Sequence, residues 1–317
     1  MKKGKRLSPL SKGVFMLSKE ILLTLSILFN QYKKKINISV IALNQNLTDN
    51  MKKDITLNHL TTEFEKSKIE KAFDDSKRII EEYQRRNIHI ITPEEKEYPE
   101  NLKMIPDHPP FLIAQGNLNL LNHKKQISVI GTRKPEQCNL KNCEKYIQYL
   151  IENKYNIISG LALGCDTIAH SLTIKNKGLT TAILPSSIMN IIPKENSKLA
   201  TAIISNNGLI LSEYILVDEP QKFHFIERDK IISGISNGIL VLETKIKGGT
   251  IQTLKHAQNQ KKKISCLNLE SNQFLIQNKV ATKIETVKDL ENFINEIEKQ
   301  KSFEKLNQST QQNLFGV

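Results

Sequence analysis

The chain of 317 residues lacks tryptophan, and aromatic residues make up only 6% of it. It also lacks an apolar run of the roughly 20 residues that a membrane-spanning helix needs. The basic start MKKGKR precedes an apolar stretch, but Lys19 and Glu20 interrupt it and no small-residue cleavage site follows. A secretory signal peptide is therefore not indicated. We expect a cytoplasmic protein without a membrane segment.

Cysteine is scarce as well, since the chain has four. Only Cys138 and Cys143 lie close together, and a C-x4-C spacing without a second cysteine pair is poor spacing for zinc. We therefore expect free thiols and no metal site. Cys165 lies in a glycine-containing loop, where we expect thiol reagents to reach it although it is not catalytic.

Fingerprints for nucleotide cofactors and for catalysis are missing too. Neither G-x-G-x-x-G nor G-x-x-x-x-G-K-[ST] occurs in the chain. Ser159, Ser186, His170 and Asp166 include the residue types of a catalytic triad, but we expect no G-x-S-x-G elbow in the chain. We predict no catalytic residue and no cofactor. His170 follows Asp166 by four residues, so we expect a structural hydrogen bond between them on one helix face.

Positive charge, by contrast, is in excess. The chain has 46 lysine and arginine residues against 33 aspartate and glutamate residues, a net charge of +13. Such an excess favours a polyanionic partner, nucleic acid above all. The alternative is a lysine-rich surface that serves solubility or follows a compositional bias.

Three regions are predicted along the chain. Residues 1–85 are lysine-rich with helical periodicity, which indicates an N-terminal helical domain. Residues 86–290 alternate short apolar runs with helical patterns, as in a parallel sheet covered on both faces. Residues 291–317 form one helix and a polar tail. The predicted fold class is α/β, a Rossmann-like, doubly wound, mostly parallel sheet with a small N-terminal helical domain.

The predicted strands are the apolar runs IHIIT, ISVIG, YNIIS, TTAILP, GLILSEY, GILVLET and KKISCL. Two of them break into glycine loops, Gly131-Thr132-Arg133 and Ser159-Gly160, before a helical pattern begins. Free N–H groups at a helix N-terminus and the absence of a Cβ atom suit an anion.

Arg133 is the strongest candidate among these loop residues for binding an anion. An arginine directly at a strand end can make paired hydrogen bonds to a phosphate, and the alternative is a salt bridge to a carboxylate such as Asp166. Ligands of a doubly wound sheet lie at the carboxyl ends of its strands. Further candidates at such ends are therefore Pro185-Ser186-Ser187, Glu243-Thr244 and Lys247-Gly248-Gly249-Thr250.

The segment PQKFHFIERDKIISG interleaves cations with aromatic rings, namely Lys222, Arg228, Lys230, Phe223 and Phe225. Basic groups follow a phosphate backbone, and aromatic faces stack on unpaired bases. We interpret this segment as a basic loop suited to single strands. The alternative is that one phenylalanine belongs to the core.

Taken in chain order, these pieces resemble the DNA-processing protein A family (DprA, also called Smf). The resemblance runs from Tyr98 to Ala281 and includes YPENLKMIPDHPPFLIAQG, VIGTRKP, IISGLALGCDTIAH, LILSEY, FIERDKIISGIS and VLETKIKGGTIQT. Proteins of this family bind single-stranded DNA, dimerise and help load the recombinase RecA, especially during natural transformation. The resemblance implies a DNA-binding protein for transformation or recombination, not an enzyme. Its expected partners are single-stranded DNA, RecA, single-strand binding protein and a second copy of the chain.

The resemblance carries a DNA-binding role over to Arg133, Ser159, Gly160, Lys222, Phe225 and Arg228. The predicted DNA-binding residues also include Lys194 of the segment PKEN, Lys230 of the basic segment, and Gly248, Gly249 and Thr250 at a strand end. The chain departs from the family pattern at Leu163, where an arginine is usual, and at Cys165, where an isoleucine is usual. It also has Asp229 and Lys230 where asparagine and arginine are usual, and Ile192 where a tyrosine precedes the proline. We expect the lost cation and the added anion to weaken DNA binding or to change the ligand.

A second hypothesis belongs to a different class of function. The same Rossmann-like superfamily includes phosphoribohydrolases and nucleotide sensors, whose enzymes resemble P-G-G-x-G-T-x-x-E. Gly248, Gly249 and Thr250 are similar to that loop, but Lys247 replaces its proline and no glutamate follows at the required offset. Nucleotide sensing or processing is therefore the alternative to DNA binding.

Overall fold

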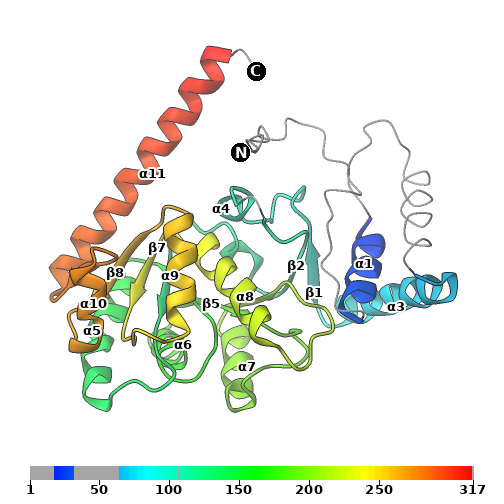
Figure 1. Cartoon of the computed structure of the whole chain (residues 1–317), viewed down its shortest axis with the longest axis horizontal. Helices are drawn as coiled ribbons and strands as arrows, with labels where there is room; N and C mark the ends of the chain where they lie inside the picture. Colours follow the sequence, from blue (N-terminus) through cyan, green and yellow to red (C-terminus); the bar gives the residue numbers. More distant parts are fainter. Residues whose placement is uncertain (1–17, 32–63, 106, 316–317) are drawn as a thin grey trace, which may run out of the picture.

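The computed structural model describes residues 18–31, 64–105 and 107–315. The basic start MKKGKR and much of the predicted helical domain over 1–85 lie outside these residues. A nine-stranded sheet, in the order β1-β2-β6-β5-β4-β3-β7-β8-β9, forms the centre of the described part (Figure 1). The strands are β1 Ile88–Ile91, β2 Leu112–Gly116, β3 Gln126–Ile130, β4 Asn156–Ser159, β5 Leu179–Leu184, β6 Leu209–Ser212, β7 Gly238–Val241, β8 Lys263–Leu267 and β9 Thr282–Ile284.

The sheet has a topological switch point between β3 and β7. From β3 the chain proceeds through β4, β5 and β6 in one direction, then returns to place β7, β8 and β9 on the other side of β3. All of these strands pair in parallel, whereas β1 and β2 add an antiparallel edge next to β6. In open α/β sheets, ligands bind beyond the carboxyl ends of the strands at this point.

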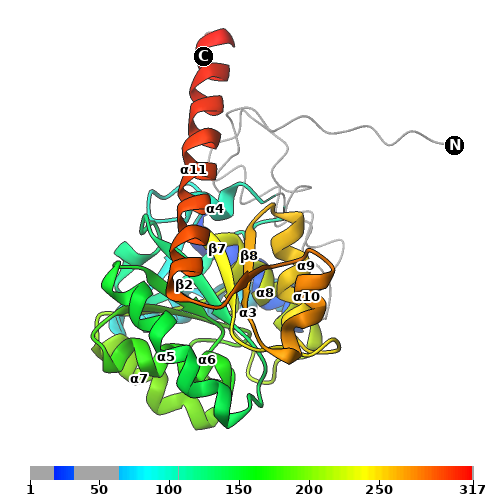
Figure 2. The same cartoon turned by 90° about the vertical axis from the view of Figure 1, so that its left-hand side faces the viewer.

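Helices cover both faces of the sheet (Figures 1 and 2). One face carries helices that pack through two apolar clusters: α1 Lys19–Gln31, α3 Lys66–Arg85, α5 Gln137–Glu152, α6 Cys165–Lys175, α7 Ser197–Ser205 and α11 Val287–Phe315. The other face carries α4 Glu100–Lys103, α8 Lys222–Ile235, α9 Thr250–Asn259 and α10 Gln273–Gln277. Figure 2 shows α11 extending beyond the body of the protein.

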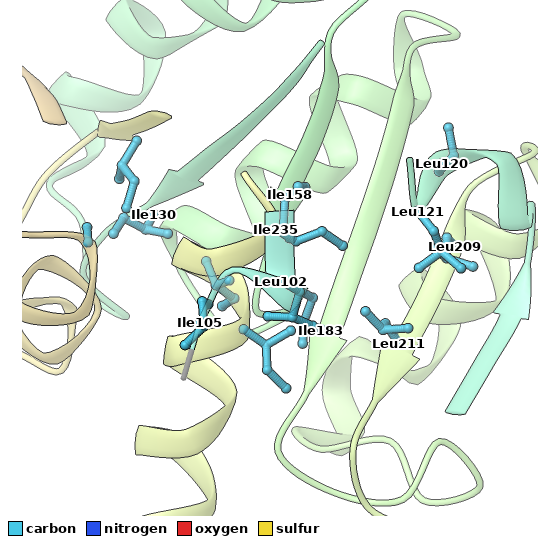
Figure 3. Close-up of a cluster of buried hydrophobic side chains, with 14 of the residues drawn as sticks. Leu102, Ile105, Leu120, Leu121, Ile130, Ile158, Ile183, Leu209, Leu211 and Ile235 are labelled. Carbon is cyan, nitrogen blue, oxygen red and sulfur yellow. The ribbon is translucent and has the colours of Figure 1, made fainter. Parts of the chain in front are cut away.

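Strand residues alternate between the two faces because successive side chains of a strand point to opposite sides. Ile157 packs with α5 and α6, whereas its neighbour Ile158 packs with Ile183 in the cluster beneath α8. Figure 3 shows this second cluster, in which Leu102 and Ile105 lie beside Gly234 of α8. Both faces of the central strands are therefore buried, which explains why they are almost continuously apolar.

The described N-terminal helices share this core. Tyr83 of α3 and Leu23 of α1 belong to one apolar cluster with Leu184 of β5. The Tyr83 hydroxyl donates a hydrogen bond to the Ile215 carbonyl at 3.3 Å, and Lys19 pairs with Glu95 at 3.0 Å. The limits of the N-terminal domain stay a prediction.

The predicted fold class and the predicted strands are confirmed. One expectation was wrong, because residues 220–234 are not a loop and belong largely to helix α8. Gln221 starts this helix through a reciprocal cap, in which its side chain accepts from the His224 backbone and the His224 ring accepts from the Gln221 N–H. Among the described residues, no helix combines the length and the apolar character needed to cross a bilayer.

Candidate functional site

Loops at the carboxyl edge of the parallel strands bring most of the predicted residues together. The first glycine loop follows β3, the second follows β4, and the loop 242–249 follows β7. The Thr132 N–H donates to the Glu243 carbonyl at 2.7 Å, which joins the loops on the two sides of the switch point. The Cys165 N–H donates to the Thr132 carbonyl at 3.1 Å, which joins the two glycine loops.

Gly164 shows how closely the two glycine loops pack. Its φ of +80° lies in a region that side-chain-bearing residues avoid, and a Cβ atom there would stand 2.5 Å from the Thr132 carbonyl oxygen. The first turn of α6 therefore lies directly against the backbone that carries Arg133.

Asp166 holds the second glycine loop from inside. Its Oδ2 atom accepts hydrogen bonds from the N–H groups of Gly160 at 3.1 Å and Ala162 at 3.2 Å. Burial raises the pKa of Asp166 to about 6, although the nearby charge of Arg228 opposes this rise. Desolvation thus outweighs ion pairing at this carboxyl.

Arg228 lies beneath the same loop, on helix α8, and is 5% exposed. Its Nη1 atom donates hydrogen bonds to the carbonyl oxygens of Gly160 at 2.6 Å and Ile183 at 2.8 Å. Its Nε atom pairs with Asp229 at 3.0 Å. A Cβ atom on Gly160 would stand 2.5 Å from Arg228 Nη1, so glycine is required there for the guanidinium to approach. Arg228 therefore connects α8 to the ends of β4 and β5.

Phe225 lies between two arginines. The Arg133 guanidinium carbon lies 5.4 Å from the centre of the Phe225 ring, and that of Arg228 lies 5.9 Å from it. Both distances are in the range of cation–π attraction. Nearby, the exposed Phe223 ring packs on His224, with 3.9 Å between ring centres, and His224 meets Tyr214 edge-on at 4.7 Å. The first turn of α8 thus presents a fixed aromatic surface beside Arg133.

The structure divides the eleven predicted DNA-binding residues by exposure. Arg133, Lys194, Lys222 and Gly249 are exposed, whereas Phe225, Lys230 and Gly248 are half-buried. The remaining four are buried, namely Ser159, Gly160, Arg228 and Thr250. The Ser159 hydroxyl donates to the Val129 carbonyl at 2.7 Å, and Lys230 pairs with Glu227 at 2.7 Å. The DNA-binding role of all eleven stays a prediction.

Three expectations about individual side chains were wrong. His170 does not bond to Asp166, because its Nδ1 atom lies 2.7 Å from the Thr180 hydroxyl and burial lowers its pKa to about 3. The alternative salt bridge of Arg133 to Asp166 is not formed, since Arg228 is the cation beside that carboxyl. Cys165 is 1% exposed, and burial raises its pKa, so its thiol is not accessible.

Sequence reasoning also overlooked residues at this edge. Lys134 and Lys245 are exposed there but were not selected, although each follows a predicted strand closely enough to be found. The pattern G-x-S-x-G does occur once, as GISNG at residues 234–238, which sequence reasoning overlooked, but it does not form an elbow. These residues run from α8 into β7, the reverse of a strand-to-helix elbow, and Ser236 is buried.

Cations at the edge differ from those elsewhere in the described part of the chain. Lysines such as Lys175, Lys263 and Lys288 pair with carboxylates on the body of the protein. No ion pair with a described residue is formed by the exposed cations of the edge, which are Arg133, Lys134, Lys194, Lys222, Lys245 and Lys247. The edge therefore has positive charge available for an anionic ligand.

Comparisons with known proteins converge on one family. The model of the family described as DNA recombination-mediator protein A matches residues 89–296. DNA processing protein DprA of Bacillus subtilis (strain 168) is 32% identical over 218 residues, which are 69% of this chain and 73% of that protein. DNA processing protein DprA of Streptococcus pneumoniae is 40% identical over 163 residues, which are 51% of this chain and 57% of that protein.

Two solved structures agree with these relatives. The X-ray structure of DNA processing protein A from Streptococcus pneumoniae is similar with a TM-score of 0.63 and 26% identity, over 86% of this chain and 91% of that chain. DNA processing protein A from Helicobacter pylori, described for its unique single-stranded DNA binding mode, gives a TM-score of 0.59 and 28% identity, over 67% of this chain and 97% of that chain.

A first prediction concerns Arg228. Arg228→Ala leaves the buried carboxyls of Asp166 and Asp229 without their cation, and breaking a buried pair in this way costs about 3–5 kcal/mol. We expect the free energy of unfolding, measured by urea denaturation, to fall by that amount. Arg228→Ala combined with Asp229→Ala should recover part of the loss, because the two effects are coupled. A variant that keeps wild-type stability would show that Arg228 is free to serve a ligand instead.

A second prediction concerns pH. The pKa of Asp166 is raised in the folded protein from its ordinary 3.8 to about 6. Its contribution to the free energy of unfolding is therefore complete below pH about 4 and is lost as the pH rises through about 6. Asp166→Asn removes this titration. We expect the stability of wild type relative to the variant to decline between pH about 4 and about 7 in parallel urea denaturations, and a constant difference would contradict the raised pKa.

Proposed function

This chain belongs to the DNA recombination-mediator protein A family, and from that premise we propose that it binds single-stranded DNA along the carboxyl edge of its parallel sheet. Its role in this proposal is that of a mediator, which protects the strand and hands it to RecA. The family membership rests on the match over residues 89–296. The choice of ligand rests on the chemistry of the edge itself.

One observation carries the proposal: unpaired cations and exposed apolar side chains occur at the same edge. Six large apolar side chains are exposed on the described part of the chain. Five of them lie in loops after the parallel strands or in the first turn of α8, namely Leu163, Met189, Leu216, Phe223 and Ile246. Cations serve phosphates and apolar faces serve bases, so this combination fits a strand whose bases are unpaired.

Each part of the site has a distinct task in this proposal. Arg133 binds a phosphate, and the Phe225 ring holds the arginine in place through the contact at 5.4 Å. Phe223, 52% exposed, offers a face on which a base stacks. Arg228 and Ser159 support the loops without touching the DNA, because both side chains are buried and donate hydrogen bonds to backbone carbonyls. Duplex DNA fits less well, since its paired bases are not available for stacking.

The proposed partners follow from the family resemblance. A mediator acts on strands that single-strand binding protein covers and that RecA then receives, so we include both proteins in the proposal, together with a homodimer and a cytoplasmic location. The relative from Helicobacter pylori is described by its unique single-stranded DNA binding mode. Nucleotide sensing remains the rival function, and thermal shifts with mononucleotides test it alongside the DNA measurements.

Arg133→Glu tests the proposed phosphate contact. We expect affinity for labelled oligo(dT), measured by fluorescence anisotropy, to fall at least tenfold, which corresponds to about 1.4 kcal/mol. The logarithmic salt dependence should become shallower by about 0.7 for the lost phosphate contact. The fold should survive because the side chain is exposed.

The matched control for this variant is Arg78→Glu, which makes the same charge change at an exposed position of α3. It should bind DNA almost like the wild type. Wild-type affinity in Arg133→Glu, or equal losses in the two variants, would remove Arg133 from the site. Duplex DNA of equal length should bind more weakly throughout.

RecA loading tests the mediator role. We expect the protein to speed the assembly of RecA filaments on single strands already coated with single-strand binding protein, measured by the rate of RecA-dependent strand exchange. Arg133→Glu should lose this stimulation together with DNA affinity. Tight DNA binding by the wild type without any stimulation would leave a strand-protecting protein and reject the mediator role.

A further inference from the structure

The switch point has two sides, and only one of them carries the predicted arginine. Arg133 belongs to the loop after β3, and the loop after β7 lies on the other side of the switch point. The Thr132 N–H reaches the Glu243 carbonyl at 2.7 Å, so the two loops are direct neighbours. A strand bound at Arg133 can therefore continue from there to residues 243–249.

The loop after β7 is held in a defined conformation. The Thr244 N–H donates to the Asn272 side-chain oxygen at 2.9 Å. The Asn272 amide nitrogen in turn donates to the carbonyls of Leu242 at 3.0 Å and Leu267 at 2.9 Å. Asn272 is fully buried, and a turn bond from the Gly248 N–H to the Lys245 carbonyl at 3.0 Å closes the tip. The tip is thus organised before any ligand binds.

This tip projects an apolar side chain between two cations. Ile246 is 70% exposed, and the flanking Lys245 and Lys247 are exposed without an ion pair to any described residue. Nothing lies within 4 Å of the position that a Cβ atom on Gly249 would take, so a ligand can approach the backbone there. Two cations on either side of an apolar side chain suit a single strand, because the cations can bind successive phosphates while the apolar group contacts the base between them.

We propose that Lys245, Ile246 and Lys247 form a second contact region, in which the strand that Arg133 binds continues across the switch point. Lys245 and Lys247 bind phosphates, and Ile246 contacts the face of a base. This inference rests on the proposed function, since it extends the same DNA path. It goes beyond that function by giving the bound strand a path, which runs from the β3 loop to the β7 loop.

Oligonucleotides of two lengths test the extension. The first is oligo(dT) of about 5 nucleotides, which covers only the Arg133 side, and the second is oligo(dT) of about 15 nucleotides, which reaches the β7 loop. We expect Lys245→Glu/Lys247→Glu to lower affinity for the longer oligonucleotide about tenfold or more and to leave the shorter one within about twofold. The salt slope for the longer oligonucleotide should become shallower by about 1.4, for two phosphate contacts.

Ile246→Ser separates the apolar contact from the charges. It should weaken binding of the longer oligonucleotide about threefold to tenfold with an unchanged salt slope, because no cation is removed. Lys124→Glu/Lys299→Glu is the matched control, with the same change in net charge. Both of its lysines are exposed, and Lys124 precedes β3 at the opposite edge of the sheet.

The outcomes separate the two proposals. Absence of oligonucleotide binding by the wild type rejects the proposed function and the extension together. Wild-type binding of both lengths, with the control and Lys245→Glu/Lys247→Glu equally affected, rejects the extension alone. Equal losses of the short and the long oligonucleotide in Lys245→Glu/Lys247→Glu also reject it, because the loop would then act on Arg133 rather than on a separate part of the strand.

Discussion

The buried guanidinium of Arg228 is the interaction on which the rest of the site depends. It joins helix α8 to the ends of β4 and β5 through two carbonyl oxygens, and it pairs with Asp229 on its own helix. Because the guanidinium occupies the space beside Gly160, no side chain fits at that position. The second glycine loop, the first turn of α8 and the Phe225 ring therefore take their places around one fixed charge.

This arrangement explains why the buried arginine below the loop is paired with carboxyls whereas the exposed arginine above it is not. Below it, Arg228 meets two carboxyls in a region where an uncompensated ion is costly. Above it, Arg133 has no carboxylate partner among the described residues and is supported by an aromatic ring instead. An aromatic face attracts a cation without neutralising it, so Arg133 keeps its charge for a ligand. The buried pair supplies the structure, and the exposed cations supply the electrostatic field.

The fold was accessible from the sequence because its signals are local and repeated. Apolar runs such as ISVIG and GILVLET end in glycine or polar residues, and the structure contains a strand at each of them. The prediction of a loop over residues 220–234 was wrong for a physical reason. The alternation of lysine, phenylalanine and histidine hides the 3.6-residue period of a helix, and the cap at Gln221 uses a histidine ring rather than a common capping residue. The burial of Arg228 was also not predictable, since arginine is almost never buried unless its partners converge in three dimensions.

The same partners change the meaning of this chain's departures from the family pattern. Asp229 was expected to add a negative charge to the groove, but its side chain is 13% exposed and pairs with Arg228 at 3.0 Å. Its charge is therefore compensated inside the protein and does not face a ligand. Leu163, which stands where an arginine is usual, is 41% exposed and does remove a cation from the second glycine loop. Of the three loops next to the switch point, those after β3 and β7 therefore carry exposed cations, whereas the loop after β4 does not.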